Sequence, residues 1–477
     1  MTKSRRIYLL SPKELSPETI AVSFAKTSRS PLSFDTIAAE LNDDKSAQFH
    51  EKWVVGYGHA SVAEHAVLHL ALENVSRLAI ETIENNRLAS YTEKSTRYQQ
   101  WDQDAFYIPE EIIGHEVESD YIKTCQLLFR TYEKCIPGVM NWLQAKNPIQ
   151  PSETEKAYHR WIHPAAVDIC RFLLPASSLA NVGMTINARA LEYAICKMLS
   201  SPLQEVQAIG EKLREVSRLE TPTLIKYAAC NEYLVSIRGK MRIYSKSLSY
   251  QPSETQTKLI SWDKEGENKV LAAVLLRFSD SASFQTCLDY VNQLTDQQRE
   301  TLVEDLMEKR GQFDQPLREF EYAQMTFDSV MDQGAYFEFK RHRMMTQTAQ
   351  NLTSELGYAI PKGITESGSG GEYGKAMREA ARVYKRIFGW NPEAASYIIP
   401  NGYNRRVVFT LNLRQAYNLI RLRTASNAHF SIQRVACQMA ENIKRIYPLL
   451  GRYLDLPSGF SWQKIETDHF SKLQIIN

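Results

Sequence analysis

The chain has 477 residues, of which 43% are hydrophobic, and its 57 Lys and Arg against 55 Asp and Glu leave a net charge of +2. The length exceeds one ordinary core and predicts two domains, and the composition excludes a disordered protein. The small net charge argues against nucleic acid as a partner, although a local basic pocket remains compatible with it.

The N-terminal sequence MTKSRRIYLLSPKEL contains no long apolar run, so we expect no signal peptide. No stretch approaches the roughly 20 apolar residues that a membrane-spanning helix requires. We therefore expect a cytoplasmic protein without membrane contact. The seven cysteines form no C-x-x-C pair, and we expect neither a metal site nor a disulfide framework.

Along the chain, apolar and polar residues alternate in 68–72, 182–186 and 407–411, which predicts three strands. The second and third runs change to helical spacing, so Asn187 and Asn412 are predicted at strand-to-helix junctions. Such a junction offers unpaired backbone N–H groups that suit a bound anion. An asparagine helix cap beside a solvated arginine is the simpler interpretation for either junction alone.

The chain contains a diverged internal repeat. The segment LLPASSLANVGMTINARALEYAICKML (173–199) aligns without gaps with IIPNGYNRRVVFTLNLRQAYNLIRLRT (398–424), and NNRLASYTEKSTRYQ (85–99) aligns with RHRMMTQTAQNLTSE (341–355). We predict two domains, residues 1–245 and 265–477. The polar segment around 245–268 is interpreted as a linker, and the Gly- and Ser-rich segment 366–374 as a flexible loop.

The first copy resembles the flavin-dependent thymidylate synthases, whose signature is R-H-R-x-x-S-x-x-x-x-S-x-R-Y after an upstream G-H-x-x-x-x-E-H. GHASVAEH (58–65) matches the upstream element, whereas Asn85 and Asn86 replace the first two residues of the signature. The family also has an arginine shortly before Leu-Pro and an N-A-R triplet. The remaining matches of this copy are Arg87, Ser90, Glu93, Ser95, Arg97, Tyr98, Arg171 and Asn187-Ala188-Arg189.

The second copy resembles the family at complementary positions. It retains the complete Arg341-His342-Arg343 triplet but has Ala349, Asn351 and Thr353 where the signature has Glu, Ser and Arg. Ser396 replaces the arginine before Pro400. The matches further along the chain are Asn412, Arg414, Asn418 and Arg423, the last of which falls on the final arginine of the family.

The resemblance implies an α+β (α/β) fold of two tandem domains, each with a central antiparallel sheet flanked by long helices. It implies reductive methylation of dUMP to dTMP with FAD, NADPH and 5,10-methylenetetrahydrofolate, and no nucleophilic cysteine. Because family members are homotetramers, it also implies a homodimer that forms a pseudo-tetramer. Its active sites would be composites of the two repeats, since each copy has lost the motif residues that the other retains.

The resemblance also assigns roles to residues. Substrate binding falls to Glu93, Ser95, Thr96, Arg97, Arg171 and Arg423, because guanidinium and hydroxyl groups hold a phosphate well. Arg423 is assigned the catalytic role of stabilising negative charge that develops on the uracil. Contacts with the flavin fall to His59, Glu93, Asn187, Arg189, Arg341, His342, Arg343, Asn412, Arg414 and Asn418.

Two other functions remain open at this point. A related enzyme could modify C5 of another pyrimidine nucleotide, because Asn85, Asn86 and Tyr322 depart from the family pattern. A non-catalytic nucleotide- or flavin-binding homologue is the other alternative. Each motif residue taken singly has a simpler explanation as a solvated or packed side chain. Their joint occurrence in family order favours a site.

Overall fold

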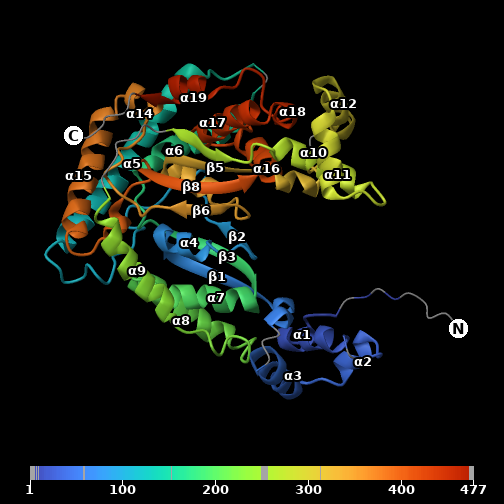
Figure 1. Cartoon of the computed structure of the whole chain (residues 1–477). Coiled ribbons are helices and arrows are strands. Elements are labelled where there is room, and N and C mark those ends of the chain that lie inside the picture. Colours follow the sequence, from blue (N-terminus) through green and yellow to red (C-terminus); the bar gives the residue numbers. More distant parts are fainter. Residues whose placement is uncertain are drawn as a thin grey trace. The chain divides into compact units, whose positions relative to one another are not determined.

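The computed structural model describes residues 6, 8, 10–28, 30–56, 60–151, 153–248, 256–311 and 313–471 (Figure 1). The chain divides into two compact units, and each unit draws on separate stretches of sequence. Unit 1 comprises residues 1–94, 105–118 and 177–250, and unit 2 comprises 95–104, 119–176 and 251–477. None of the described helices is both apolar enough and long enough to cross a membrane.

Unit 1 contains a three-stranded antiparallel sheet in the order β1 (Val67–Ser76), β3 (Leu179–Asn187), β2 (Ala89–Glu93). Alternate residues of the central strand β3 are buried, which is the pattern of a sheet with one face on a core. The other elements of unit 1 are α1 (Pro17–Lys26), α2 (Phe34–Ala39), α3 (Asp43–Phe49), η1 (His50–Gly56), η2 (Ala60–His65), α4 (Arg77–Ile83), α7 (Ala188–Leu199), α8 (Gln204–Ser217) and α9 (Glu232–Ser245).

Unit 2 contains a four-stranded antiparallel sheet in the order β4 (Thr257–Trp262), β5 (Gln324–Asp332), β8 (Asn404–Asn412), β6 (Thr346–Ala349). A two-stranded ladder joins β7 (Ile360–Pro361) to β9 (Phe470–Ser471). The helical segments are α5 (Glu118–Lys146), α6 (Glu155–Cys170), η3 (Arg171–Leu173), α10 (Gly266–Arg277), α11 (Phe284–Gln293), α12 (Asp296–Met307), η4 (Arg318–Tyr322), α13 (Gln333–Phe339), α14 (Lys362–Glu366), α15 (Gly370–Phe388), η5 (Ala394–Ile398), α16 (Leu413–Arg423), α17 (Phe430–Ile446), α18 (Pro448–Gly451) and α19 (Trp462–His469).

The core of unit 2 lies between its sheet and the helices α13, α16 and α17, and both α13 and α16 pack against α17. Figure 1 shows α16 and α17 beside this sheet. Phe327 of β5 and Phe409 of β8 are paired in the ladder, and their rings stack with centroids 5.4 Å apart. Phe339 of α13 meets the Phe409 ring edge-on at 4.5 Å. Burial of large apolar rings is the main stabilising term for such a core. It fixes α13 and α16, which carry residues of the candidate site.

The three predicted strands are confirmed as β1, β3 and β8. Asn187 and Asn412 lie at strand-to-helix junctions, as predicted. Each is an N-cap: the Asn187 side chain accepts a hydrogen bond from the N–H of Ala190, and that of Asn412 from the N–H of Gln415. The helix-cap interpretation therefore describes the local structure of both asparagines.

Two interpretations of polar segments are wrong in part, and residues 249–255 of the first segment lie outside the described residues. The segment 245–268 contains β4, which pairs with β5 and whose Thr257 is buried, so it is not a linker over residues 257–262. In the segment 366–374, α14 ends at Glu366 and α15 begins at Gly370. Tyr373 is fully buried and its hydroxyl donates to the carbonyl of Ala359. Tertiary burial outweighs the low helix propensity of glycine here.

Unit 2 contains residues from both copies of the sequence repeat. Pro175 and Pro400, which are equivalent in the repeat, form an antiparallel β-bridge. The backbone N–H of Ala176 donates to the carbonyl of Ile399, and that of Asn401 to Leu174. Mixed helix and antiparallel sheet are confirmed for the fold class. The finer arrangement of that fold and the domain bounds 1–245 and 265–477 stay predictions.

Candidate functional site

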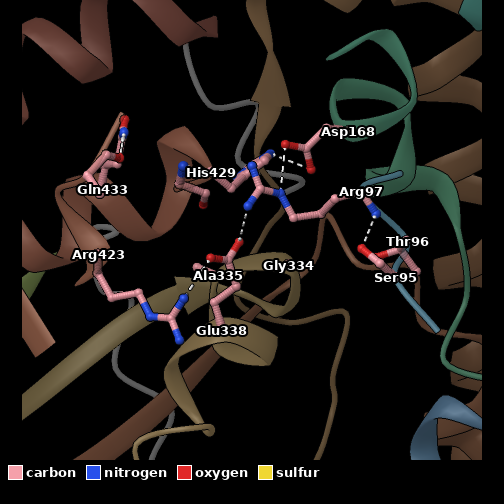
Figure 2. Close-up of polar contacts among 12 residues, drawn as sticks. Ser95, Thr96, Arg97, Asp168, Gly334, Ala335, Glu338, Arg423, His429 and Gln433 are labelled. Carbon is pink, nitrogen blue, oxygen red and sulfur yellow. Dashed lines mark hydrogen bonds and ion pairs between the residues drawn. The ribbon is translucent and has the colours of Figure 1, made fainter. Parts of the chain in front are cut away.

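Three arginines and two carboxylates gather inside unit 2 and are called the arginine cluster: Arg97, Arg171, Arg423, Asp168 and Glu338. Arg97 Nε lies 3.0 Å from Asp168 Oδ2, and Arg171 Nε lies 3.1 Å from Asp168 Oδ1. Arg423 Nη1 lies 3.1 Å from Glu338 Oε2. Figure 2 shows Glu338 between Arg423 and Arg97. The first-copy and second-copy residues of one chain therefore meet in one unit.

Each side chain of the arginine cluster is fixed by its place on an element. Asp168 lies in the last turn of α6 and Arg171 opens η3, so the two are three residues apart and face each other. The carbonyl of Arg171 accepts a hydrogen bond from the Asn401 side chain at 3.0 Å. Glu338 lies near the end of α13, and Arg423 is the last residue of α16.

Arg97 lies in the turn after β2, and a serine shapes that turn. The backbone N–H of Arg97 donates to Ser95 Oγ at 3.2 Å, and the N–H of Gln99 donates to the Ser95 carbonyl. Thr96 Oγ1 accepts a hydrogen bond from Arg171 Nη1 at 3.3 Å. The short hydroxyl residues thus orient the turn and touch the neighbouring guanidinium.

The arginine cluster is poorly exposed to water. The side chains of Arg171 and Glu338 are 2% and 5% exposed, so their charges interact in a medium of lower dielectric than water. Burial raises the pKa of Asp168, and the guanidinium groups of Arg171 and Arg97 oppose that shift. Burial also lowers the pKa of Arg423, which Glu338 counteracts. Removing one partner of such a buried ion pair destabilises a fold, because the remaining charge is left uncompensated.

Two neutral histidines border the arginine cluster. Burial, with Arg423 and Arg341 nearby, lowers the pKa of His342 to about 3, and His342 Nε2 accepts a hydrogen bond from Arg423 Nε at 2.9 Å. Burial lowers the pKa of His429 well below its usual value. His429 Nδ1 caps α17 by accepting the N–H of Ser431, which assigns its proton to Nε2, 3.8 Å from Asp168 Oδ1.

Several buried polar atoms of this region make no well-aligned hydrogen bond within the described part of the chain. They are Glu338 Oε1, Asp168 Oδ1, Arg171 Nε and His429 Nε2. A buried polar atom without a partner is costly, and such atoms gather where a ligand or water completes the bonding. The donors among them, Arg171 Nε and His429 Nε2, suit an anion.

The structure brings together five of the residues that the sequence assigned to a site. These are Thr96, Arg97, Arg171, His342 and Arg423. Ser95 supports the same turn. Arg341 and Arg343 flank His342 before β6, and Arg341 is exposed. The functional roles of all these residues stay predictions.

Other assigned residues have different partners. In unit 1, Glu93 forms a buried ion pair with Arg77 at 3.0 Å, and Arg189 pairs with Glu64 at 2.5 Å. In unit 2, Arg414 donates to the Pro316 carbonyl and to Glu321, and Asn418 lies 3.4 Å from Arg421 Nη2. His59 lies outside the described residues.

Sequence reasoning missed Asp168, Glu338 and His429. Asp168 could have been found from its helical spacing to Arg171, because residues three apart on a helix are neighbours. Glu338 lies on α13, three residues before Arg341, but nothing in its sequence marks it as a partner for arginines of the other copy. No local pattern indicates that His429 is buried beside Asp168. These contacts depend on the tertiary fold.

A separate groove of about 560 Å³ lies at the β4–β5 end of the unit 2 sheet. Trp262, Phe284 and Tyr322 line it, and the rings of the latter two stack with centroids 6.1 Å apart. The arginine cluster does not line this groove. The buried charges and this aromatic surface are therefore distinct features of unit 2.

Known proteins are similar in sequence to this chain over most of its length. The profile of the family described as thymidylate synthase complementing protein matches the chain twice, at residues 10–223 and 258–449. The chain belongs to this family. A UPF0159 protein of Chlamydia muridarum is 30% identical over 442 residues, which cover 89% of this chain and 83% of that relative. A UPF0159 protein of Thermoplasma acidophilum is 28% identical over 448 residues, covering 86% and 89%.

Other relatives match only one part of the chain. A flavin-dependent thymidylate synthase of Clostridium tetani is 28% identical over 217 residues, which cover 82% of that protein but 44% of this chain. Most of a relative's length therefore corresponds to less than half of this chain. The double family match confirms the tandem of two diverged copies inferred from the internal repeat.

Proposed function

We propose that this member of the thymidylate synthase complementing protein family is a flavin-dependent thymidylate synthase whose active site is a composite of its two copies. The observation that carries the proposal is the arginine cluster, in which Arg97 and Arg171 of the first copy meet Arg423 of the second. Relatives such as that of Clostridium tetani are named for this activity.

In this proposal Arg97 and Arg171 bind the phosphate of dUMP. Asp168 holds both guanidinium groups, and one terminal nitrogen of each lies near Glu338 Oε1. That nitrogen of Arg171 also donates to the Gly334 carbonyl at 3.3 Å. Paired guanidinium donors recognise phosphate oxygens through charge-assisted hydrogen bonds. The Thr96 hydroxyl, next to Arg171, adds a polar group at the same place.

Arg423 would act on the uracil ring. Its Nε donates to the neutral His342, so its position is fixed before a ligand arrives. A preorganised cation lowers the energy of a transition state in which negative charge develops on the ring. The part-buried setting strengthens that interaction relative to water.

The chemistry that FAD supplies when bound is the transfer of reducing equivalents, and NADPH and 5,10-methylenetetrahydrofolate are the proposed co-substrates. Arg341 and Arg343 would bind the anionic groups of FAD. His342 between them is neutral at physiological pH because its pKa is about 3. The exposure of Arg341 and the excess of cations at the arginine cluster fit an anionic cofactor at this place.

The test is to purify the full chain and measure flavin absorbance at roughly 450 nm, followed by turnover of dUMP with NADPH and methylenetetrahydrofolate. Rescue of a thymidine-requiring bacterium by the wild type, and loss of rescue in Arg423→Ala, is the expected result. Bound flavin without thymidylate would favour modification of another pyrimidine nucleotide. Absence of flavin would favour a non-catalytic nucleotide-binding protein.

A further inference from the structure

The arginine cluster has a carboxylate at its centre. Arg97 Nη1 and Arg171 Nη2 lie 3.8 and 3.6 Å from Glu338 Oε1, and Arg423 Nη1 lies 3.1 Å from Glu338 Oε2. Three guanidinium groups from three separate segments therefore face one side chain. Figure 2 shows the Glu338 carboxylate between Arg97 and Arg423.

The two carboxylates of the arginine cluster hold the arginines in different ways. Asp168 contacts the Nε atoms of Arg97 and Arg171 at 3.0 and 3.1 Å, so it fixes the orientation of both planes. Glu338 contacts their terminal nitrogens, and its Oε1 makes no well-aligned hydrogen bond within the described residues. The distances of 3.6 and 3.8 Å are those of loose ion pairs. Glu338 thus occupies an anion position without completing its hydrogen bonds.

The charge of the arginine cluster bears on what can bind there. Three arginines and two carboxylates leave one net positive charge, because His342 and His429 are neutral. A phosphate monoester carries close to two negative charges near pH 7. Seating it beside both carboxylates would leave excess negative charge in a poorly solvated place, which is unfavourable. Without the charge of Glu338, two positive charges would match the phosphate.

We propose that Glu338 is a specificity-determining residue whose carboxylate occupies the position that a ligand's phosphate takes and competes with it for Arg97 and Arg171. The identity of the ligand as a nucleotide rests on the proposed function, whereas the competition requires only a phosphate group. Binding of a phosphate therefore displaces or neutralises Glu338. The affinity of the site for dianionic nucleotides is lower than its three arginines alone would give.

The experiment compares the full-length wild type with Glu338→Gln by isothermal titration, using inorganic phosphate and dUMP as separate probes. We expect both probes to bind Glu338→Gln about tenfold more tightly or better, because the competing charge is removed while the side-chain volume is kept. Unchanged or weaker binding by a folded Glu338→Gln would overturn the inference.

The matched control is Glu466→Gln, which removes a carboxylate from another buried arginine of unit 2. Glu466 Oε2 lies 2.6 Å from Arg434 Nη1, outside the arginine cluster. We expect this variant to bind both probes as the wild type does. Equal gains in both variants would show a general effect of net charge and would also overturn the competition.

Loss of the Glu338 charge leaves arginines unpaired, so Glu338→Gln could fail to fold. A second measurement therefore uses wild-type crystals soaked with dUMP. We expect the phosphate between Arg97 and Arg171, with the Glu338 side chain moved away from them. A phosphate bound elsewhere, or bound with both Glu338 ion pairs intact, would contradict the inference.

Failure of the inference and failure of the proposed function have different signatures. If Glu338→Gln binds phosphate more tightly but the wild type forms no thymidylate, Glu338 competes with phosphate and the proposed synthase function is wrong. If the wild type forms thymidylate but Glu338→Gln gains no affinity for phosphate, the proposed function stands and the inference about Glu338 is wrong.

Discussion

Arg171 of the first copy lies 3.6 Å from Glu338 of the second, and both side chains are almost entirely buried. The two residues come from distant segments of one chain. Their contact requires that η3 and α13 fold together. One chain is therefore enough to assemble the arginine cluster.

The first prediction concerns Arg97. We expect Arg97→Ala to weaken dUMP binding by about 2–4 kcal/mol, since a charge-assisted contact to phosphate is lost and Asp168 loses a partner. Flavin content should stay at the wild-type level. Isothermal titration and the absorbance ratio of the purified protein measure the two quantities. Loss of flavin with unchanged nucleotide affinity would reverse the proposed division of roles.

The second prediction concerns stoichiometry. If each chain carries one composite site, a homodimer should contain about two flavins. Light scattering gives the mass of the particle, and absorbance after denaturation gives its flavin content. About four flavins per dimer would mean that the remaining motif positions also form sites, contrary to the composite arrangement.

The third prediction uses the low pKa of His342. Because its folded pKa of about 3 lies below that of an unfolded histidine, the buried neutral ring stabilises the fold above about pH 6.5. That stability is lost as the pH falls from 6.5 towards 3, by about 1.4 kcal/mol for each pH unit. His342→Gln should therefore make the midpoint of urea unfolding depend less on pH over this range. The control is His159→Gln at an exposed position, which should leave the pH dependence of the midpoint as in the wild type.

The fourth prediction concerns Glu267 of α10 and has the opposite sign. Burial raises its pKa to about 7, although it accepts the N–H of Leu450 at 2.6 Å. The stability that this group contributes is present below about pH 4.5 and is lost as the pH rises through 7, by at most about 3 kcal/mol. Glu267→Gln should gain stability relative to the wild type between pH 5 and 8. A stability difference between the two proteins that stays constant from pH 5 to 8 would contradict the raised pKa of Glu267.

The fifth prediction concerns Gly402, which follows the bridge between the two copies. A Cβ at this position would lie 2.6 Å from the Tyr373 hydroxyl and 3.0 Å from Met377 Cε. We expect Gly402→Ala to lower the free energy of unfolding by about 1–3 kcal/mol through overpacking. Thermal melts measure it, with Gly371→Ala as the control, because a Cβ there meets no atom within 4 Å.

The alternation of apolar and polar residues predicted β1, β3 and β8, because a strand with one buried face has an apolar residue at every second position. The spacing of Arg97, Arg171 and Arg423 within the motifs identified the cations of the cluster. Glu338 was not predicted, since even the partner nearest in sequence, Arg423, lies 85 residues away. Local composition also failed for α15, where burial of Tyr373 determines the structure.

The β-bridge between Pro175 and Pro400 joins equivalent positions of two covalently linked copies. In an assembly of identical subunits, one codon change alters every symmetric position at once. Here a change at one proline leaves its equivalent untouched. The tandem chain can therefore explore asymmetric substitutions, such as Asn85 on one copy and Ala349 on the other, that a symmetric ancestor could not have tested separately.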